Sequence, residues 1–180
     1  MDVQPVLELI AAASPRLPFT LVGIGGHGGA GKSTLAGAIP DAQVVGTDEF
    51  WDGREFELSR LAHEVLEPLL RGVDARFHGF DWDAGCRFSE LRVVRPVGIV
   101  VIEGVCALHR MFRGAYDVRV WVEAPYAVRL ARGIARDGEE ARQTWEEVWM
   151  PSEDRYIARD DPIPSAHVII DGAPGRAAEA

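Results

Sequence analysis

The chain has 180 residues, enough for one domain with a substantial core and too few for two ordinary domains. Its 28 acidic residues outnumber 19 basic ones, and the net charge of −9 makes most of the surface repel nucleic acid. The two cysteines form no metal or disulfide pattern, and no stretch resembles a membrane span or signal peptide. We therefore expect residues 1–180 to form one cytoplasmic domain that binds neither nucleic acid nor membrane.

The predicted elements alternate between apolar runs and helical patterns, as a parallel sheet with crossover helices requires. Apolar runs predict strands over residues 19–24, 43–46, 97–102, 118–122 and 168–170. Helical spacing predicts helices over residues 3–13, 32–39, 57–71, 125–136 and 141–158. Gly72 is placed to cap the third helix, whereas Pro151 predicts a break or kink within the last. The fold class is α/β, with a five-stranded parallel sheet and helices on both faces.

The most informative motif follows the first predicted strand. Residues 26–33 fit G-x-x-x-x-G-K-[ST], in which glycines let successive backbone N–H groups point at a polyphosphate beside a helix N-terminus. Lys32 would reach the β- and γ-phosphates of ATP, and Ser33 would offer its hydroxyl to Mg²⁺. The residues expected to hold the nucleotide here are Gly26, Gly28, Gly29, Ala30, Gly31, Lys32, Ser33 and Thr34.

The same stretch also satisfies a dinucleotide-binding fingerprint. Gly23, Gly25 and Gly28 fit G-x-G-x-x-G, and Asp48 lies twenty residues beyond the last glycine. A dinucleotide site has no use for a Lys-Ser pair at the helix start, whereas a triphosphate site needs both, so we favour the triphosphate. A glycine-rich turn without a ligand is disfavoured, because so many glycines cost backbone entropy without a return in packing.

Acidic residues follow two of the predicted strands. Asp48 comes just after the second strand and Glu103 directly after the strand at 97–102, at the edge where open α/β sheets bind ligands. Asp48 would accept the proton of an attacking hydroxyl or orient Mg²⁺, and Glu103 would serve the metal together with Ser33. The structural alternatives are a solvated acidic loop and a chance acid at a strand end.

Basic residues recur along the predicted helix at 125–136. Arg129, Arg132 and Arg136 are spaced to lie near one face, where they would neutralise charge on a transferred phosphoryl group. Arg142, which follows this helix, is a further residue expected to contact the nucleotide. With glycines nearby, the segment at about 129–145 is a candidate lid, although a solvated face paired with nearby acids is the structural alternative.

Aromatic and acidic residues suggest where an acceptor would bind. Phe50 and Trp51 follow Asp48 and Glu49, and Phe80, Asp81, Trp82 and Asp83 form a second cluster that would stack on an acceptor and hydrogen bond to it. A surface turn is the alternative for the second cluster. The candidate acceptor-binding residues are Asp48, Phe50, Trp51, Phe80, Asp81, Trp82 and Arg129.

These motifs, in this order, resemble the uridine kinase family of P-loop kinases, which includes phosphoribulokinase, nicotinamide riboside kinase and pantothenate-type relatives. The resemblance runs from about residue 19 to 171. It rests on the phosphate loop, Asp48 to Trp51, Phe80 to Trp82, Ile102 to Gly104, and the arginine helix. It implies a three-layer P-loop kinase fold, Asp48 as general base, Ser33 and Glu103 as ligands of Mg²⁺, and arginines that contact phosphate or substrate.

The chain departs from that family on the acceptor side. Residues 53–58 lack the His-Pro-Asp-Ala-Phe-Asp stretch that holds the ribose, Phe80 replaces a tyrosine, and Gly133 stands where a lid arginine is common. Uridine, cytidine, nicotinamide riboside, another nucleoside, a sugar or a small alcohol are all open as acceptors. We expect an ATP-dependent small-molecule kinase. The alternatives are a P-loop ATPase or switch without an acceptor, and a binding protein that has lost transfer; the sequence gives no oligomeric state.

Overall fold

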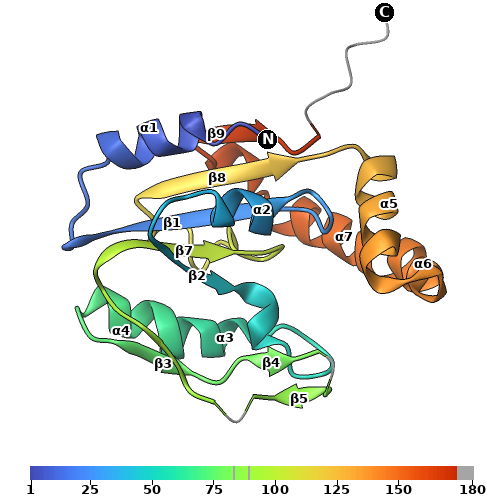
Figure 1. Ribbon diagram of the computed structural model, residues 1–180, viewed down its shortest axis with the longest axis horizontal. Helices are drawn as coiled ribbons and strands as arrows, with labels where there is room; N and C mark the ends of the chain where they lie inside the picture. Colours follow the sequence, from blue (N-terminus) through green and yellow to red (C-terminus); the bar gives the residue numbers. More distant parts are fainter. Residues whose placement is uncertain (83, 89, 174–180) are drawn as a thin grey trace, which may run out of the picture.

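The centre of the molecule is a five-stranded parallel sheet, seen in a computed structural model that describes residues 1–82, 84–88 and 90–173 (Figure 1). Its strands are β1 (Phe19–Gly26), β2 (Ala42–Gly46), β7 (Gly98–Glu103), β8 (Val118–Glu123) and β9 (Val168–Asp171). They lie in the order β2-β7-β1-β8-β9, all parallel, with β1 in the middle. These are the five predicted strands, so the predicted α/β fold class is confirmed.

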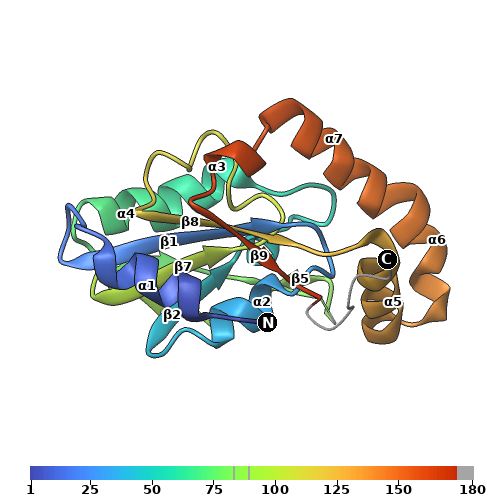
Figure 2. The ribbon, with the colours of Figure 1, turned by 90° about the horizontal axis from the view of Figure 1, so that it is seen from above.

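Helices cover both faces of this sheet, as Figure 2 shows. The α-helices are α1 (Gln4–Ala12), α2 (Lys32–Gly37), α3 (Leu58–Leu61), α4 (Glu67–Leu70), α5 (Tyr126–Asp137), α6 (Arg142–Thr144) and α7 (Met150–Asp160). Short 3-10 turns are η1 (Thr47–Phe50), η3 (Glu139–Ala141) and η5 (Ile163–Ser165), and wider π turns are η2 (Ala62–Leu66) and η4 (Trp145–Trp149). Helices α1 and α2 lie on one face, and α3, α4 and α7 lie on the other.

Alternate residues of the central strand point into two separate apolar layers. Leu21 belongs to the core formed with α3, η2, α4 and the segment after β7, whereas Val22 and Ile24 belong to the core formed with α1 and α2. All three side chains are fully buried. Burying one such side chain stabilises the fold by about 1.5–3 kcal/mol. Because successive side chains of a strand point to opposite faces, this one strand supplies apolar side chains to both layers.

Two long helices pass through a proline instead of ending at it. Pro151 follows the π turn η4, and Pro68 follows the π turn η2, each at the start of the next α-helical stretch. Proline lacks an N–H and clashes with the carbonyl four residues back, and a widened turn avoids both problems. The predicted break at Pro151 is therefore a π turn within a continuous helical segment from Arg142 to Asp160.

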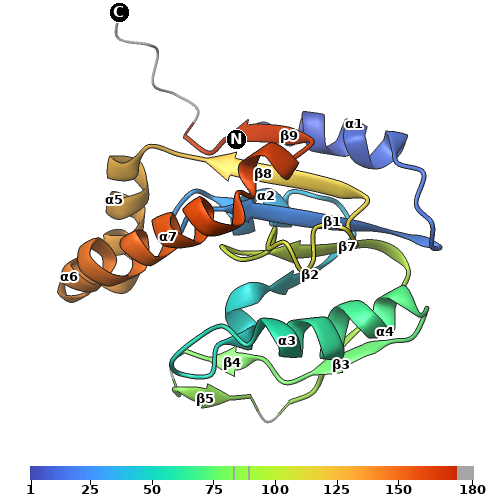
Figure 3. The ribbon, with the colours of Figure 1, turned by 180° about the vertical axis from the view of Figure 1, so that it is seen from behind.

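Two small antiparallel hairpins extend beyond the sheet, and neither was predicted. Strand β3 (Ala75–Phe77) pairs with β6 (Arg92–Val94), and β4 (Phe80–Asp81) pairs with β5 (Cys86–Arg87). Figure 3 shows the β4–β5 hairpin and the α5–α6 segment on the same side of the molecule, past the carboxyl ends of the central strands. Within the described residues, none of the helices combines the length and apolar character needed to cross a bilayer.

Candidate active site

The connection between β1 and α2 has a backbone shape that requires glycine. Gly29 and Gly31 have φ angles of +72° and +105°, in the left-handed region that side chains disfavour. A Cβ on Gly29 would also lie 2.5 Å from the carbonyl oxygen of Arg129. The loop leads directly into α2, so its backbone is arranged as a phosphate-binding loop at a helix N-terminus.

Two glycines of the dinucleotide-binding fingerprint are explained by the packing of side chains against the central strand. A Cβ on Gly23 would lie 2.7 Å from the Tyr116 ring, and one on Gly25 would lie 2.8 Å from Leu108. The expectation that these glycines bring no return in packing is therefore wrong, because they let large side chains lie against the central strand. The fingerprint reflects close packing, and it provides no support for a dinucleotide.

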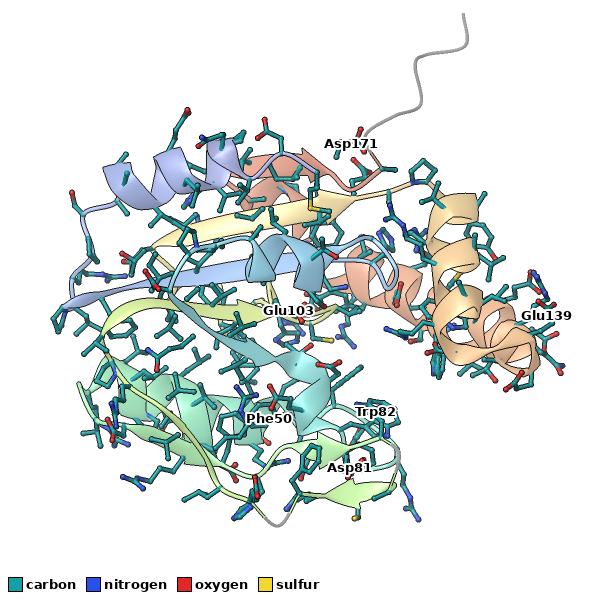
Figure 4. All side chains as sticks on the ribbon, viewed as in Figure 1. Phe50, Asp81, Trp82, Glu103, Glu139 and Asp171 are labelled. Carbon is teal, nitrogen blue, oxygen red and sulfur yellow. The ribbon has the colours of Figure 1, made fainter. Side chains whose placement is uncertain are left out.

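Lys32 and Glu103 are buried at the end of the site, and the exposed Ser33 lies beside Glu103. The Lys32 Nζ donates to the carbonyl of His27 at 2.8 Å, and the Ser33 hydroxyl donates to Glu103 Oε1 at 2.9 Å. Burial lowers the pKa of Lys32 and raises that of Glu103, while their opposite charges partly offset both shifts. Figure 4 shows Glu103 near the carboxyl end of the sheet.

Asp48 and Glu49 are neighbours with different surroundings. The Glu49 carboxylate accepts the N–H of Gly46 at 2.9 Å and pairs with Arg92. Asp48 is exposed, and among the described residues nothing forms a hydrogen bond or ion pair with its carboxylate. Its charge nevertheless influences the pKa values of Lys32, Glu103 and Arg136, so it lies within electrostatic reach of the phosphate loop.

A close contact between two connections brings Asp48 and Glu103 together. Gly46 at the end of β2 is paired in register with Glu103 at the end of β7. The next residues also touch, because a Cβ on Gly104, at φ +142°, would overlap the buried side chain of Thr47. The Glu-Gly sequence after the strand therefore supplies a carboxylate and then the space that the turn carrying Asp48 needs.

The three arginines of α5 occupy three different environments. Arg129 is buried, and its Nε donates to the carbonyl of Ala124 at 3.1 Å. Arg132 donates to the carbonyls of Gly29 at 3.1 Å and Gly172 at 2.9 Å, so it joins the phosphate loop to the end of β9. Arg136 is 70% exposed. Of the three, Arg129 alone is buried, whereas Arg132 and Arg136 are exposed.

The remaining residues that we predict to contact the nucleotide lie either in the phosphate loop and the start of α2 or in the segment after α5. Ala30 is buried and its carbonyl accepts from Arg132 at 3.4 Å, while Ser33 and Thr34 are exposed at the start of α2. Arg142 pairs with Glu139 and, at 3.7 Å, with Glu146. Its charge is therefore paired within the segment from Glu139 to Glu146, and the structure does not place it at the phosphate loop.

A buried carboxylate that sequence reasoning missed lies against the phosphate loop. Glu153 of α7 accepts the N–H of Gly28 at 3.0 Å through Oε2, and the same oxygen lies 3.6 Å from Arg129 Nη1. Burial raises the pKa of Glu153, and the charges of Lys32 and Arg129 oppose that shift. No local signal marks this residue, because its partner lies 125 positions away.

His27 is the second residue of the loop, and its ring is largely buried. Its ring meets Trp121 edge-on at 5.7 Å, and its Nε2 lies 3.6 Å from the Asp154 carboxylate. Burial, with the charges of Arg129 and Lys32, lowers the pKa of His27 to about 4. The imidazole is therefore neutral at pH 7.

The aromatic residues proposed for the acceptor separate into core and surface. Phe50 is completely buried against Phe77, so its predicted contact with a substrate is corrected to a role in the core. Phe80 is also buried, edge-on to Trp82. Trp82 is 53% exposed and stacks on Trp51 at 5.8 Å. Figure 4 shows Phe50 and Trp82 on the hairpin side of Glu103.

The acid of this second cluster stabilises its hairpin. Asp81 accepts the N–H of Ala84 at 3.0 Å, which helps to close the β4–β5 turn, and Asp83 lies outside the described residues. Two surface cavities of about 280 Å³ lie away from the phosphate loop. One is lined by Arg60, Glu64, His78, Arg87 and Phe88, and the other by Arg16, Leu17, Leu21, Leu70, Gly114, Ala115 and Asp117.

Comparisons with known proteins agree with this arrangement, although no protein-family model matches the chain. A uridine kinase of Halobacterium salinarum is 27% identical over 169 residues, which cover 82% of this chain and 73% of that protein. The structure of a possible uridine kinase from Bacillus stearothermophilus aligns with a TM-score of 0.70 and 18% identity, covering 94% of this chain and 97% of the other. The chain is thus similar in sequence to curated uridine kinases and shares the fold of a uridine kinase-like P-loop protein.

A second solved structure shows that the fold extends to a protein with a different name. The D-glycerate 3-kinase of Cryptococcus neoformans aligns with a TM-score of 0.56 and 13% identity, covering 94% of this chain and 95% of the other. For this uridine kinase-like chain, the fold is therefore established, and the acceptor must be argued from its own residues.

The residues of this uridine kinase-like site fit a magnesium ion that is shared with phosphate oxygens. Within the described part of the chain, no three acidic, histidine or cysteine side chains form a ready-made metal cage. Mg²⁺ usually takes one or two protein carboxylates and completes its shell with substrate phosphates and water. The hydrogen-bonded Ser33 hydroxyl and Glu103 carboxylate supply the oxygen ligands that this mode needs.

One departure of this chain from its relatives has a packing explanation. A side chain at Gly133, the position where a lid arginine is common, would overlap the indole of Trp145. The same indole lies against the phosphate loop, because a Cβ on Gly28 would be 3.0 Å from its ring. Gly133 therefore leaves the space that this indole occupies between α5 and the phosphate loop.

Proposed function

We propose that the protein transfers the γ-phosphoryl group of ATP to a hydroxyl of a small nucleoside-like acceptor, with Mg²⁺ bound at Ser33 and Glu103. The observation that carries this proposal is the state of Asp48. Its carboxylate is exposed and unpartnered among the described residues, yet close enough to influence Lys32 and Arg136. A free carboxylate beside a phosphate loop suits a general base for a hydroxyl.

In the proposed step, the acceptor hydroxyl gives its proton to Asp48 while its oxygen forms a bond to the γ-phosphorus. The bond between that phosphorus and the β,γ-bridging oxygen breaks, and ADP leaves with the electron pair. Lys32 and Arg136 offset negative charge on the phosphoryl oxygens, and Arg132 contributes by holding the loop through the carbonyls of Gly29 and Ala30. When bound, Mg²⁺ would neutralise further charge on the phosphates.

The exposed aromatic surface supports a planar acceptor. Trp51 and Trp82 are stacked with their rings 21° from parallel, and about half of Trp82 is open to solvent. Aromatic stacking contributes about 0.5–1.5 kcal/mol beyond burial and selects for flat rings. A nucleoside base fits this surface better than an aliphatic sugar or small alcohol does.

The experiment measures ADP release from Mg-ATP against a panel of nucleosides, vitamins, sugars and small alcohols. We expect one acceptor class to stimulate turnover, and Asp48→Asn to lower kcat by about 1,000-fold, the effect of losing a general base. Glu8→Gln, at an exposed acid of α1, is the charge-matched control and should leave turnover unchanged. Acceptor-independent turnover that survives Asp48→Asn would overturn the proposal and indicate an ATPase or switch.

A further inference from the structure

Trp145 connects the two halves of the nucleotide end of the site. It belongs to η4 and is 2% exposed. One part of its ring lies against Gly133 of α5 and another against Gly28 of the phosphate loop, so closely that neither position has room for a side chain. Its indole therefore fills the contact between the lid helix and the phosphate loop.

The polar edge of the same indole reaches Asp137. The Trp145 Nε1 donates to Asp137 Oδ2 at 2.9 Å. The Asp137 carboxylate in turn accepts two hydrogen bonds from Arg136, at 2.7 Å from Nε and 2.9 Å from Nη2. The guanidinium carbon of Arg136 also lies 5.7 Å from the centre of the Trp145 ring. A largely exposed arginine is thus held by three separate contacts.

Arg136 is an exposed arginine of α5 that interacts electrostatically with Asp48. Asp137 is the main cause of the raised pKa of Arg136, and Asp48 also contributes, which places Arg136 within electrostatic reach of the proposed general base. A free arginine side chain has many rotamers, and fixing one of them during reaction has an entropic cost. An arginine that is already ordered avoids that cost in the transition state.

We propose that Trp145 is a positioning residue that, through Asp137, holds Arg136 in place for the transferred phosphoryl group. This inference rests on the proposed function, because it assigns Arg136 a task in phosphoryl transfer. Trp145 itself touches no reacting atom. Its position between Gly28 and Gly133 means that the loop and the arginine are ordered by the same side chain.

The test is a double-mutant cycle between Trp145→Phe and Arg136→Ala. Phenylalanine keeps a ring against both glycines and removes the N–H that Asp137 accepts. We expect Trp145→Phe to lower kcat by about 10-fold, the value of one hydrogen bond to a charged group, with KM for ATP unchanged. In the Arg136→Ala background the same change should have no further effect, because the two residues act as one unit.

Two further variants keep the test decisive. Asp137→Asn should reproduce the loss of kcat, since an amide accepts only one of the two arginine hydrogen bonds. Trp149→Phe is the matched control, because Trp149 lies edge-on to Trp145 in the same turn. It should leave kcat unchanged. Equal losses from Trp145→Phe with and without Arg136 would overturn the proposal and give Trp145 a purely structural role.

The affinity for Mg-ADP with aluminium fluoride separates this inference from the proposed function. The complex mimics a transferring phosphoryl group, so its binding depends on Arg136 without any acceptor. If the unmodified protein binds this complex but phosphorylates no acceptor, the kinase activity is contradicted. The role of Trp145 can still be tested in that case, by measuring the affinity for the complex in the same double-mutant cycle. A parent that binds neither Mg-ADP nor this complex overturns both proposals.

Discussion

The donor side and the acceptor side of the site are built in different ways. Around the phosphate loop, Lys32, Glu103 and Glu153 are buried, and Arg132 joins Gly29 to Gly172 through hydrogen bonds to their carbonyls. On the acceptor side, two short hairpins and a stacked pair of tryptophans carry the exposed surface. In the proposed site, the groups for phosphoryl transfer thus lie beside the central sheet, and the proposed acceptor surface lies on short connections, where sequence changes cost little stability.

The largest effect on stability is expected at the contact that joins the two sides. Gly104→Ala would push a methyl group into Thr47 and strain a φ angle of +142°. We expect a loss of about 3 kcal/mol or more in unfolding free energy and of about 100-fold in kcat, because the turn carrying Asp48 must move. Gly114→Ala, where no atom lies within 4 Å of the added group, is the control. Urea unfolding measures the free energy of unfolding, and turnover assays measure kcat. Equal values for the Gly104 and Gly114 variants would contradict the close contact between Gly104 and Thr47.

The donor side should also respond to pH through His27. Burial lowers the pKa of His27 from 6.5 in the unfolded chain to about 4 in the folded protein. Between these two pH values the unfolded chain binds a proton more tightly than the folded protein does. The free energy of unfolding therefore falls as the pH drops. We expect His27 to contribute a loss of about 2 kcal/mol in unfolding free energy between pH 7.5 and pH 5. His27→Asn should remove this contribution, and His63→Asn, at an exposed helix position, should retain it. Unchanged pH dependence in His27→Asn would mean that the ring is not buried as described.

A smaller effect is expected where α7 supports the loop. Glu153→Ala removes the acceptor of the Gly28 N–H and the partner of Arg129, so KM for ATP should rise about 10-fold with kcat nearly constant. Glu153→Gln, which still accepts that N–H, should recover most of the affinity, and Glu147→Ala on the exposed side is the control. A fall in kcat without a change in KM would place Glu153 elsewhere in the reaction.

The smallest effect is expected on the acceptor side. Trp82→Ala removes the exposed half of the stacked pair, and we expect KM for the acceptor to rise about 5-fold while KM for ATP stays constant. Leu91→Ala removes an apolar side chain of similar exposure and should change neither value. If the Trp82 variant changes KM for ATP and leaves KM for the acceptor unchanged, the assignment of Trp82 to the acceptor side is contradicted.

The sequence predicts the donor side well because its signals are local. A strand, a glycine-rich turn and a Lys-Ser pair are adjacent in the chain, and β-branched runs mark the five strands. The placement of Asp48 and Glu103 near one edge of the sheet was also predictable, because parallel strands bring their carboxyl ends together. The bounds of those strands shift by only one or two residues, as with β1, which continues to Gly26.

What the sequence did not reveal depends on distant partners or weak patterns. Glu153 and Trp145 act on residues more than a hundred positions away, and an acid in an amphipathic helix is normally read as exposed. The four hairpin strands have only two or three residues each, too short for a period-two pattern. Phe50 was misassigned because an aromatic residue beside a candidate base looks the same in sequence whether it faces a ligand or the core.

The π turn before Pro151 sets the rotational phase of the helix that follows it. An α-helix advances by about 100° per residue, and a π turn accommodates one residue more than an α turn does. Removing one residue from 145–149 would therefore swing Glu153 and Asp154 about a quarter of the way around the helix axis, away from Gly28 and His27. The extra residue of this π turn therefore aligns α7 with the phosphate loop, which lies about 120 positions earlier in the chain.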